Sequence, residues 1–198
     1  MRLRPQSRMA GATKLELCYD DNMIKRWKEL SREEVLRKYS WLIEKRVYKL
    51  PSGEVADYYI RAVKSGACVL AVTEGNQIVT VKQYRPGPDR IYNELPGGVV
   101  EDDEDPKLAG IRELKEETGY FGDVVWRGQW QNDAYTQQER NIIVATNCKK
   151  VSEPKLDNTE FAEVELLNIK DFITKARNGE LTDTAGAMLG LDHLGLLK

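Results

Sequence analysis

The chain has 198 residues, 41% of them hydrophobic and 31% charged, which suits one globular domain with a short appendage. Its formal net charge of −2 provides no overall basic field, which disfavours general electrostatic binding to nucleic acid or to an anionic membrane. A polyanionic small-molecule ligand would therefore need a local site, in which a metal ion or a few arginines supply the positive charge.

The cysteine and histidine content narrows the chemistry. Cys18, Cys68 and Cys148 are odd in number and form no CxxC pair, so we expect a reduced cytoplasmic protein with Cys68 and Cys148 in its core. His193 is the only histidine, which disfavours zinc chemistry and excludes triads that need more than one histidine. No apolar stretch approaches the roughly 20 residues that span a bilayer, and the basic segment 1–12 lacks an apolar signal core, so no membrane partner is expected.

The predicted elements begin with an N-terminal extension. Met23–Tyr39 has the pattern of a helix, and Ser31 with Glu34 matches a capping box. The pattern then changes to that of strands. We therefore predict a partly helical extension over residues 1–40, followed by one domain over residues 41–198.

The rest of the chain alternates between strands and helices. A hairpin turn is predicted at Leu50–Gly53, and the apolar strand Cys68–Thr73 is expected to be central in a sheet. The other predicted strands are Trp41–Tyr48, Ala56–Ile60, Ile78–Tyr84, Val124–Trp130, Asn141–Thr146 and Phe161–Leu166, and the predicted helices are Pro106–Thr118, Ile169–Asn178 and Ala185–Leu197. This alternation predicts a single mixed α/β domain.

The helix predicted at Pro106–Thr118 carries the most informative residues. Asp105 stands at its N-cap position, and Gly119 stands where a left-handed C-terminal cap is expected. At about 100° per residue, one side of the helix should face the core, and it is formed by Leu108, Ile111, Leu114 and Thr118.

Glu113, Glu116 and Glu117 converge on another side of this helix. Their carboxylates repel one another, and Gly110 in a helix interior costs about 1 kcal/mol relative to alanine, so a sequence selected only for stability would avoid both features. Divalent cations resolve the repulsion, and all-oxygen ligands favour Mg²⁺ or Mn²⁺ over zinc. Ala109 and Gly110 are expected to leave room for an ion and a phosphate. The alternative is an ordinary solvated acidic face.

The spacing around the helix distinguishes between these alternatives. Gly98 is followed by five residues, Glu104, seven residues and then the segment Arg112–Tyr120, which reads Arg-Glu-Leu-Lys-Glu-Glu-Thr-Gly-Tyr. This pattern resembles the Nudix box at every specified position, and we therefore expect a Nudix hydrolase. Arg112 lies one turn before Glu116 and can pair with it.

The resemblance to the Nudix family extends over roughly residues 40–195 and follows its branch of ADP-ribose and ADP-sugar pyrophosphatases. Trp41, Leu50–Gly53, Val81–Pro86 and Glu94–Gly98 occur in the order found in that branch. The resemblance implies a Nudix-type α/β/α sandwich with a mixed sheet. It also implies hydrolysis of a nucleoside diphosphate linked to another group, most plausibly ADP-ribose or a nucleotide sugar, to a nucleoside monophosphate and a sugar phosphate.

The resemblance implies a metal centre on the predicted helix. Its ligands would be three carboxylates and one backbone carbonyl, from Glu113, Glu116, Glu117 and Gly97. Arg112 would orient the glutamates, and Glu104 would support the geometry of loop and helix. Bound Mg²⁺, or Mn²⁺, would lower the pKa of the attacking water and neutralise developing charge.

Outside the box, the resemblance implies contacts with the substrate. Arg85 would bind phosphate, and Glu139 would act as general base or additional metal ligand. Trp41 and Tyr58 would stack on the nucleobase, with a homodimer expected because N-terminal strands in this branch usually complete a neighbour's site. Glu94 would hydrogen-bond the substrate or the groups around it. The structural alternatives are a surface charge for Arg85, an exposed loop acid for Glu139 and core packing for the aromatics.

One segment departs from the branch. Its later loop usually carries a proline, whereas Gln131–Gln138 contains none. The loop has a tyrosine near this point, and in this feature it resembles Nudix enzymes that act on diadenosine polyphosphates. The alternatives to a nucleotide-sugar pyrophosphatase are therefore a dinucleoside polyphosphate hydrolase and, from another class, a non-catalytic Nudix nucleotide sensor.

Overall fold

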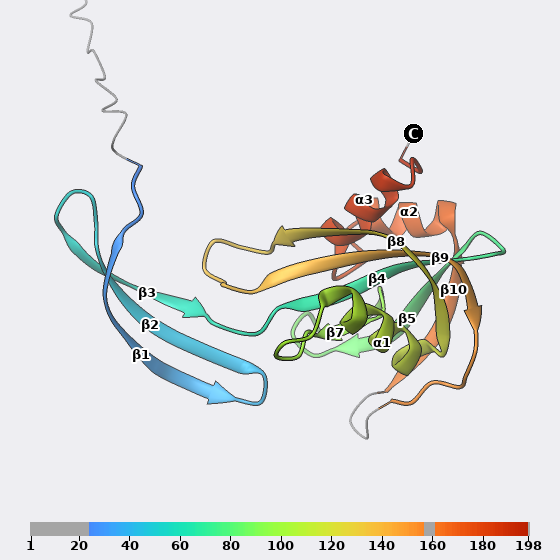
Figure 1. The fold of residues 1–198 in the computed structure, drawn as a ribbon, viewed down its shortest axis with the longest axis horizontal. Coiled ribbons are helices and arrows are strands. Elements are labelled where there is room, and N and C mark those ends of the chain that lie inside the picture. Colours follow the sequence, from blue (N-terminus) through green and yellow to red (C-terminus); the bar gives the residue numbers. More distant parts are fainter. Residues whose placement is uncertain (1–23, 157–160, 198) are drawn as a thin grey trace, which may run out of the picture.

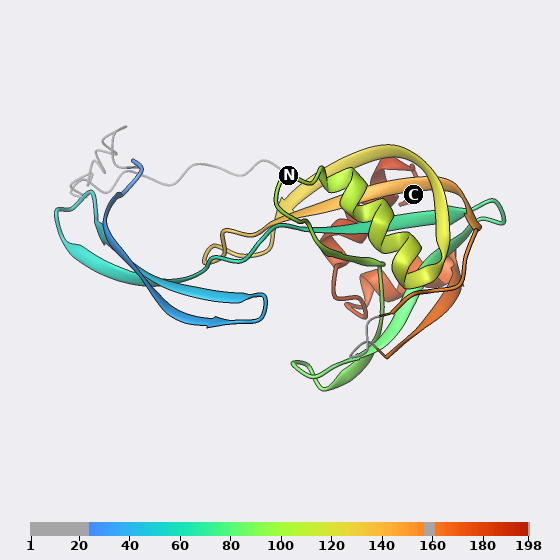
Figure 2. The ribbon, with the colours of Figure 1, turned by 60° about the horizontal axis from the view of Figure 1, so that its bottom comes forward.

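The computed structural model describes residues 24–156 and 161–197, which form two β-sheets and three helices (Figure 1). A three-stranded sheet projects to one side of a compact body, and the views in Figures 1 and 2 agree on this arrangement. Its strands lie in the order β1 (Lys28–Lys38), β2 (Trp41–Lys49) and β3 (Val55–Arg61), all antiparallel. The hairpin predicted around Leu50–Gly53 is confirmed, because β2 and β3 flank this turn.

The helix predicted at Met23–Tyr39 is wrong, because residues 28–38 form the strand β1; Met23 itself lies outside the described residues. β1 pairs with β2 along its length, and Ser31 of the apparent capping box lies opposite Val47 inside this ladder. The glutamates, arginines and leucines of this segment have good helix propensity, but pairing with a neighbouring strand outweighs a weak local preference. The boundary predicted between residues 40 and 41 falls in the turn that joins β1 to β2.

The body is built on a seven-stranded mixed sheet. Its main order is β10-β5-β4-β9-β8, with β6 paired to β5 and β7 paired to β4. The strands are β4 (Gly66–Thr73), β5 (Gln77–Arg85), β6 (Arg90–Glu94), β7 (Gly97–Val99), β8 (Tyr120–Gln131), β9 (Glu139–Lys150) and β10 (Ala162–Asn168). β4 and β9 are parallel, whereas the other pairs are antiparallel. The central position predicted for Cys68–Thr73 is confirmed, because β4 lies in the middle and is buried from Gly66 to Val72.

Helices cover both faces of this sheet, so the predicted α/β/α sandwich is confirmed (Figure 2). α1 (Pro106–Thr118) packs on the face that carries Val69 and Ile143. α2 (Ile169–Arg177) and α3 (Thr184–His193) cover the opposite face, and α3 ends earlier than the predicted Leu197. Because successive side chains along β4 and β9 point to opposite faces, these two strands contribute residues to the cores on both sides of the sheet.

The expected core positions of two cysteines are confirmed. Cys68 and Cys148 are buried free thiols, and Cys18 lies outside the described residues. In the part of the chain that the structure describes, no helix combines the length and apolar character needed to cross a membrane.

Candidate active site

The helix α1 begins and ends where its capping residues predict. The Asp105 side chain accepts a hydrogen bond from the Lys107 backbone N–H, and Pro106 occupies the first turn. Gly119 adopts a left-handed conformation with φ of 74° and donates its N–H to the carbonyl of Lys115. A side chain at Gly119 would also meet the Ser152 carbonyl oxygen at 2.0 Å, so glycine is required here on two grounds.

The core-facing side of α1 differs from the predicted one. Leu108 is 66% exposed, so its predicted burial is wrong, whereas Leu114 and Thr118 are buried as predicted. Ala109 and Gly110 are buried too, and a Cβ on Gly110 would lie 2.7 Å from Cγ1 of Ile143. The expectation that these small residues leave room for an ion is therefore wrong. They let the helix approach the sheet, because the core-facing side centres on Gly110 and Leu114 instead of Leu108.

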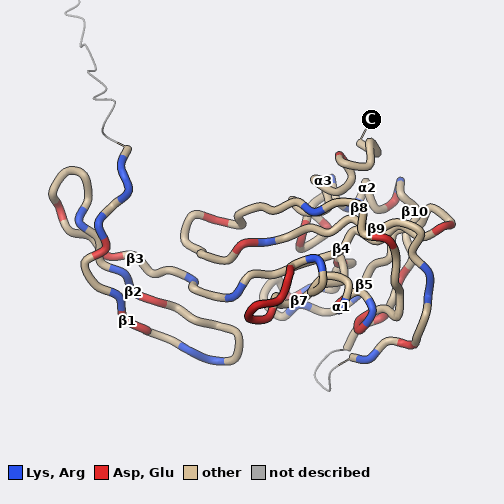
Figure 3. Tube along the Cα trace, viewed as in Figure 1, with Lys and Arg blue, Asp and Glu red and all other residues tan. Residues whose placement is uncertain are grey.

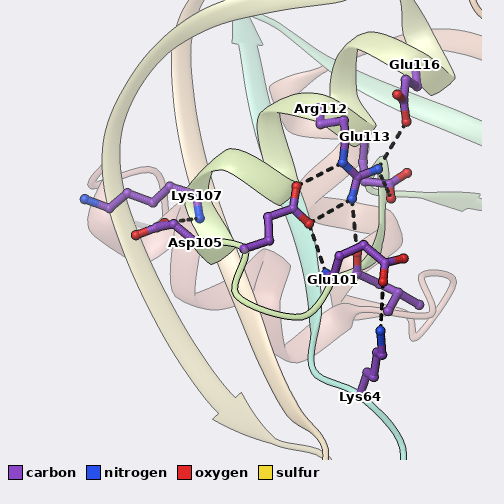
Figure 4. A network of polar contacts seen from close by, with 9 residues as sticks. Lys64, Glu101, Asp105, Lys107, Arg112, Glu113 and Glu116 are labelled. Atoms are coloured by element: carbon purple, nitrogen blue, oxygen red, sulfur yellow. Dashed lines mark hydrogen bonds and ion pairs between the residues drawn. The ribbon is translucent and has the colours of Figure 1, made fainter.

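Arg112 is the centre of an ion-pair network on the exposed side of α1 (Figure 4). Its guanidinium donates to both carboxylate oxygens of Glu104 at 3.0 and 3.1 Å, to Glu113 at 2.8 Å and to Glu116 at 3.1 Å. It also donates to the carbonyl oxygen of Val99 at 3.2 Å. Glu104 in turn accepts from the Glu101 backbone N–H, so Arg112 joins the loop before the helix to the acidic side of the helix.

Two glycines bring β7 against these glutamates. A Cβ on Gly97 would lie 2.3 Å from the Ala67 carbonyl oxygen, so only glycine can follow β4 this closely. A Cβ on Gly98 would lie 2.3 Å from Oε1 of Glu113, so the backbone runs directly beside that carboxylate. The Gly97 N–H donates to Glu117 at 2.8 Å. The sequence Gly97-Gly98 thus places backbone groups next to two of the three predicted metal ligands.

This donor set fits a hard divalent cation by its chemistry, since the carboxylates of Glu113 and Glu117 stand beside one backbone segment and Glu116 lies on the same helix. Among the residues that the structure describes, no three acidic, histidine or cysteine side chains are grouped so as to hold a metal as they stand. In Figure 4, Glu113 and Glu116 both accept hydrogen bonds from Arg112, so their carboxylates lie at its guanidinium instead of around a shared ion position. To share one ion, these carboxylates would turn from Arg112 toward Gly97.

A pocket of about 630 Å³ opens between the two sheets, with one wall formed by Val99, whose carbonyl Arg112 contacts. Its lining comes from the β1–β2 turn, the end of β3, the β3–β4 connection and the ends of β5 and β9. Five of the lining residues are cationic, namely Arg37, Arg61, Lys64, Arg85 and Arg140, and the aromatic ring of Trp41 lies among them. Among the described residues none that lines this pocket is acidic, and we call it the cationic pocket. Such a lining suits phosphate groups attached to a planar ring.

Each cation of the cationic pocket is held by a carboxylate that stands outside it. The pairs are Arg37–Glu34, Arg61–Asp133, Lys64–Glu101, Arg85–Glu94 and Arg140–Asp183, with nitrogen–oxygen distances of 2.5 to 2.9 Å. Figure 3 shows the acidic loop between β7 and α1 from which Glu101 comes. These acids pair with the cations from outside the pocket and leave its described lining positive.

Comparison with known proteins agrees with this geometry. A family model described as the NUDIX domain matches residues 63–184, which is more than half of the chain. The chain belongs to the Nudix family. It is a Nudix hydrolase, as its box predicts.

Two curated relatives and one solved structure illustrate the similarity. An ADP-ribose pyrophosphatase of Bacillus subtilis (strain 168) is 29% identical over 142 residues, covering 70% of this chain and 77% of that protein. An ADP-sugar pyrophosphatase of Mus musculus is 34% identical over 165 residues, covering 74% and 76%. A crystal structure of an ADP compounds hydrolase matches with a TM-score of 0.68 at 18% identity, covering 88% of this chain and 98% of that one, and it shows the shared fold.

Arg85 and Glu94, both predicted to contact substrate, contact each other in this Nudix hydrolase. The Arg85 guanidinium donates to both oxygens of Glu94, and Gln83 donates a further hydrogen bond to the same carboxylate at 3.0 Å. Glu94 is buried, whereas Arg85 is partly exposed and lines the cationic pocket. The hydrogen bond and charge of Glu94 raise the pKa of Arg85, so the guanidinium stays charged. The geometry places Arg85 at the pocket and Glu94 behind it.

Trp41 and Tyr58 lie on opposite faces of the N-terminal sheet. The register pairs Ile43 with Arg61 on one face, and Trp41 shares that face, where the Arg61 guanidinium lies 5.8 Å from its ring. Tyr58 pairs with Arg46 on the other face. There it lies in an aromatic cluster with Trp27, Tyr48 and Tyr135. The structure therefore brings Trp41, but not Tyr58, together with Arg85.

The loop that lacks the expected proline is held by β3 instead. The Arg61 backbone N–H donates to the carbonyl of Tyr135, and its carbonyl accepts from the N–H of Gln137, in the pattern of a parallel bridge. The Arg61 side chain also pairs with Asp133. Glu139 follows this loop as the first residue of β9 and is exposed. By alternation it shares the face of Ile143, which packs against Gly110, so Glu139 lies on the α1 side of the sheet.

Sequence reasoning missed Arg61, Lys64, Arg140 and Asp183. Arg61 ends β3 and Lys64 lies in the connection between the sheets, and no local pattern indicates the position of either residue. Arg140 did leave a signal, because it directly precedes the buried run Asn141–Ala145, of which Ile142–Ala145 is apolar. A charged residue next to fully buried neighbours in a central strand is uncommon and marks a candidate functional residue.

Proposed function

We propose that this Nudix hydrolase cleaves the pyrophosphate of ADP-ribose or of a related nucleoside-diphosphate sugar, giving a nucleoside monophosphate and a sugar phosphate. The observation that carries the proposal is the cationic pocket, which joins five cations and Trp41 next to the Nudix box. The relatives named as ADP-ribose and ADP-sugar pyrophosphatases support the same substrate class.

Each part of the site has a task in this reaction. Arg85 binds the substrate phosphates with its guanidinium, which Glu94 holds in place. Trp41 offers a ring face for the nucleobase. Glu113, Glu116, Glu117 and the Gly97 carbonyl would hold Mg²⁺, with Mn²⁺ as a substitute, and Arg112 would orient Glu113 and Glu116, to which it donates hydrogen bonds. A bound ion would supply Lewis-acid activation of water and charge neutralisation at the substrate phosphates.

Glu139 is our candidate for the general base or an additional ligand of the ion. It stands on the α1 side of the sheet, at the end of β9 that carries the cationic pocket. An exposed carboxylate on a short strand end can swing toward a bound phosphate, which suits proton transfer from water. Its substitution by glutamine should lower kcat and leave KM nearly unchanged.

The deciding experiment is Mg²⁺-dependent release of nucleoside monophosphate from a panel of ADP-ribose, ADP-glucose, GDP-mannose, UDP-glucose, NADH and diadenosine polyphosphates. Wild type should turn over ADP-ribose or an ADP-sugar, and Glu117→Gln should lower kcat by about 100-fold or more, as expected when a charged group at the reacting centre is lost. Glu163→Gln is the matched control, because Glu163 is an exposed acid on the edge strand β10 and should leave turnover unchanged.

The panel separates the alternatives. A preference for diadenosine polyphosphates would leave the proposed role of the catalytic helix unchanged. It would make a dinucleoside polyphosphate hydrolase the better assignment, as Tyr135 suggests. A folded wild type that turns over no compound and still binds nucleotide would overturn the proposal in favour of a nucleotide sensor.

We also propose that two copies of the chain form the active unit, a homodimer. All eleven residues of β1 are exposed, and the N-terminal sheet exposes Trp27, Leu30, Val35, Leu36, Tyr39, Trp41, Val55 and Tyr59. An apolar surface of this extent favours a protein partner. Trp41 and Tyr58 face opposite sides of the sheet, so one nucleobase could contact both residues only if each came from a different chain.

Light scattering should give the mass of a dimer, and a monomer mass would contradict the homodimer. Trp41→Ala and Tyr58→Ala should each raise KM for ADP-ribose. If one site takes Trp41 from one chain and Tyr58 from the other, a refolded mixture of the two variants should regain part of the lost activity, since hybrid dimers contain one intact site. Absence of any recovery would place both residues in the same chain's site or outside it.

A further inference from the structure

We propose that Asp183 is a positioning residue, which fixes the guanidinium of Arg140 so that Arg140 binds the substrate phosphates beside Arg85. The proposal rests on the proposed function and assigns two residues to its phosphate subsite. Three observations support it. They are the contacts of Asp183, the residues that surround the Arg140 guanidinium, and the difference in exposure among the acids that pair with the pocket's cations.

Asp183 stands at the N-cap of α3 but does not cap the helix. Its backbone carbonyl accepts from the N–H of Ala187, whereas its side chain makes no cap hydrogen bond. The carboxylate pairs with Nη2 of Arg140 at 2.5 Å instead. An aspartate at this position normally stabilises the helix through its side chain, so its use on Arg140 indicates a role outside α3.

Three walls hold the Arg140 guanidinium. Its central carbon lies 5.6 Å from the ring of Trp130, and that ring packs against Gly186, where a Cβ would lie 2.6 Å from it. A Cβ on Gly66 would lie 2.6 Å from Nη1, so the absence of a side chain there makes room for the guanidinium. The α3 helix, β8 and β4 therefore fix its plane.

Arg140 retains binding capacity after these contacts. Its side chain is 19% exposed and lines the cationic pocket, so a ligand in the pocket can reach it. A phosphate oxygen in the pocket is a suitable acceptor for the donors of a planar guanidinium.

The acids behind the pocket fall into two groups. The side chains of Glu94 and Asp183 are 3% and 16% exposed, whereas those of Glu34, Asp133 and Glu101 are at least 47% exposed. Burial raises the pKa of Asp183, and the nearby Arg140 and Arg85 oppose that rise whereas Glu94 adds to it, so the two acid–arginine pairs influence each other. Arg85 and Arg140 are therefore the firmly held cations, and the other three can move.

This division matches what pyrophosphate cleavage needs. The diphosphate must be held in a fixed position relative to the Nudix glutamates, because small displacements of reacting atoms greatly reduce rates. Arg85 and Arg140 come from strands of the central sheet and have buried anchors, so they suit this task. Arg37, Arg61 and Lys64 have exposed partners and suit variable parts of the substrate.

The test combines steady-state kinetics with ADP-ribose and equilibrium binding of inorganic pyrophosphate in the presence of Mg²⁺. Asp183→Asn and Arg140→Lys should each raise KM, and the Kd for pyrophosphate, about tenfold or more, with kcat within a few fold, because a fixed charged hydrogen bond is lost. The double variant should be no worse than the more severe single variant. Asp192→Asn, an exposed acid at the other end of α3, is the matched control.

The outcomes separate this proposal from the proposed function. Unchanged KM and Kd in a folded Asp183→Asn would overturn it, and so would effects of the two substitutions that multiply in the double variant. If Asp183→Asn does not fold, Arg140→Lys decides, since it keeps the charge opposite Asp183. A wild type that fails to hydrolyse ADP-ribose, with pyrophosphate binding still weakened in both variants, would refute the substrate assignment and support the role of Asp183.

Discussion

The structures of the Nudix box and of the N-terminal sheet are determined in different ways, although both regions contribute to the cationic pocket. In residues 97–119, caps, spacing and glycines determine the geometry locally, and the bounds predicted for the helix match those of α1. In residues 28–61, the structure depends on pairing between strands, and a segment with helical propensity became β1. The carboxylates that we propose as metal ligands thus lie on a helix whose geometry is determined by neighbouring residues in the sequence. The surface that we propose to contact the variable part of the ligand depends instead on contacts between residues far apart in the sequence.

The largest expected difference between the two regions concerns their leucines. Leu114→Ala removes a fully buried side chain and should lower the free energy of unfolding by about 2–5 kcal/mol. Leu36→Ala in the exposed strand β1 should change it by less than about 0.5 kcal/mol. Leu108→Ala is the control within the helix and should behave like Leu36→Ala. Chemical denaturation measures all three, and a concentration-dependent loss in Leu36→Ala would show that β1 is buried between two chains.

A second test concerns the reason for the glycine in α1. Gly110→Ala should lower the free energy of unfolding by up to about 2 kcal/mol, because the overpacking of about 1–3 kcal/mol against Ile143 exceeds the gain of about 1 kcal/mol in helix propensity. Gly87→Ala is the control, since a Cβ there would meet nothing within 4 Å. If Gly110→Ala instead gained stability and lost metal-dependent activity, Gly110 would serve the ion and not the packing.

The smallest effect concerns the contact of Glu104 with Arg112. The hydrogen bond from Arg112 lowers the pKa of Glu104 below its ordinary value of 4.5, so the contact contributes stability above that value and loses it as the pH falls through the lowered pKa. Wild type should exceed Glu104→Gln by about 1 kcal/mol or less at pH 7, and the two should converge as the pH falls through the lowered pKa of Glu104. Denaturation at several pH values measures this difference in stability. A difference that stays constant with pH would show that the contact with Arg112 is not its cause.

Much of the site could be predicted because its determinants lie close together in the sequence. Asp105, Gly119 and the glutamate spacing report on one helix, and the pairing of Arg112 with Glu116 follows from helical geometry. The error at Leu108 arose because hydrophobicity alone does not reveal that Ala109 and Gly110 are the residues facing the sheet. Small residues signal close packing only once the neighbouring surface is known.

The cationic pocket could be predicted only in part. Arg85 and Trp41 were identified through family resemblance, but their meeting with Arg61 and Arg140 depends on how β3 and the loop before β9 pair. The position of Tyr58 on the far face of its sheet follows from the register of β2 and β3, which the sequence alone leaves undetermined. Glu94 was also identified through family resemblance, whereas its pairing with Arg85 and the role of Asp183 required the three-dimensional structure.

The parallel pairing of β4 with β9 has a consequence for folding kinetics. These central strands are joined by the chain segment that contains β5, β6, β7, α1 and β8, so their contact closes a loop around the whole Nudix box. Such a non-local contact forms slowly, because loop-closure entropy is lost before the pairing compensates for it. Gly97 is fitted against β4, and Arg140 lies on β9, so the proposed metal-binding side and the proposed phosphate-binding side meet only when this loop closes. Hydrolytic activity should therefore return at the rate at which the central sheet forms, and no partly folded chain should be active.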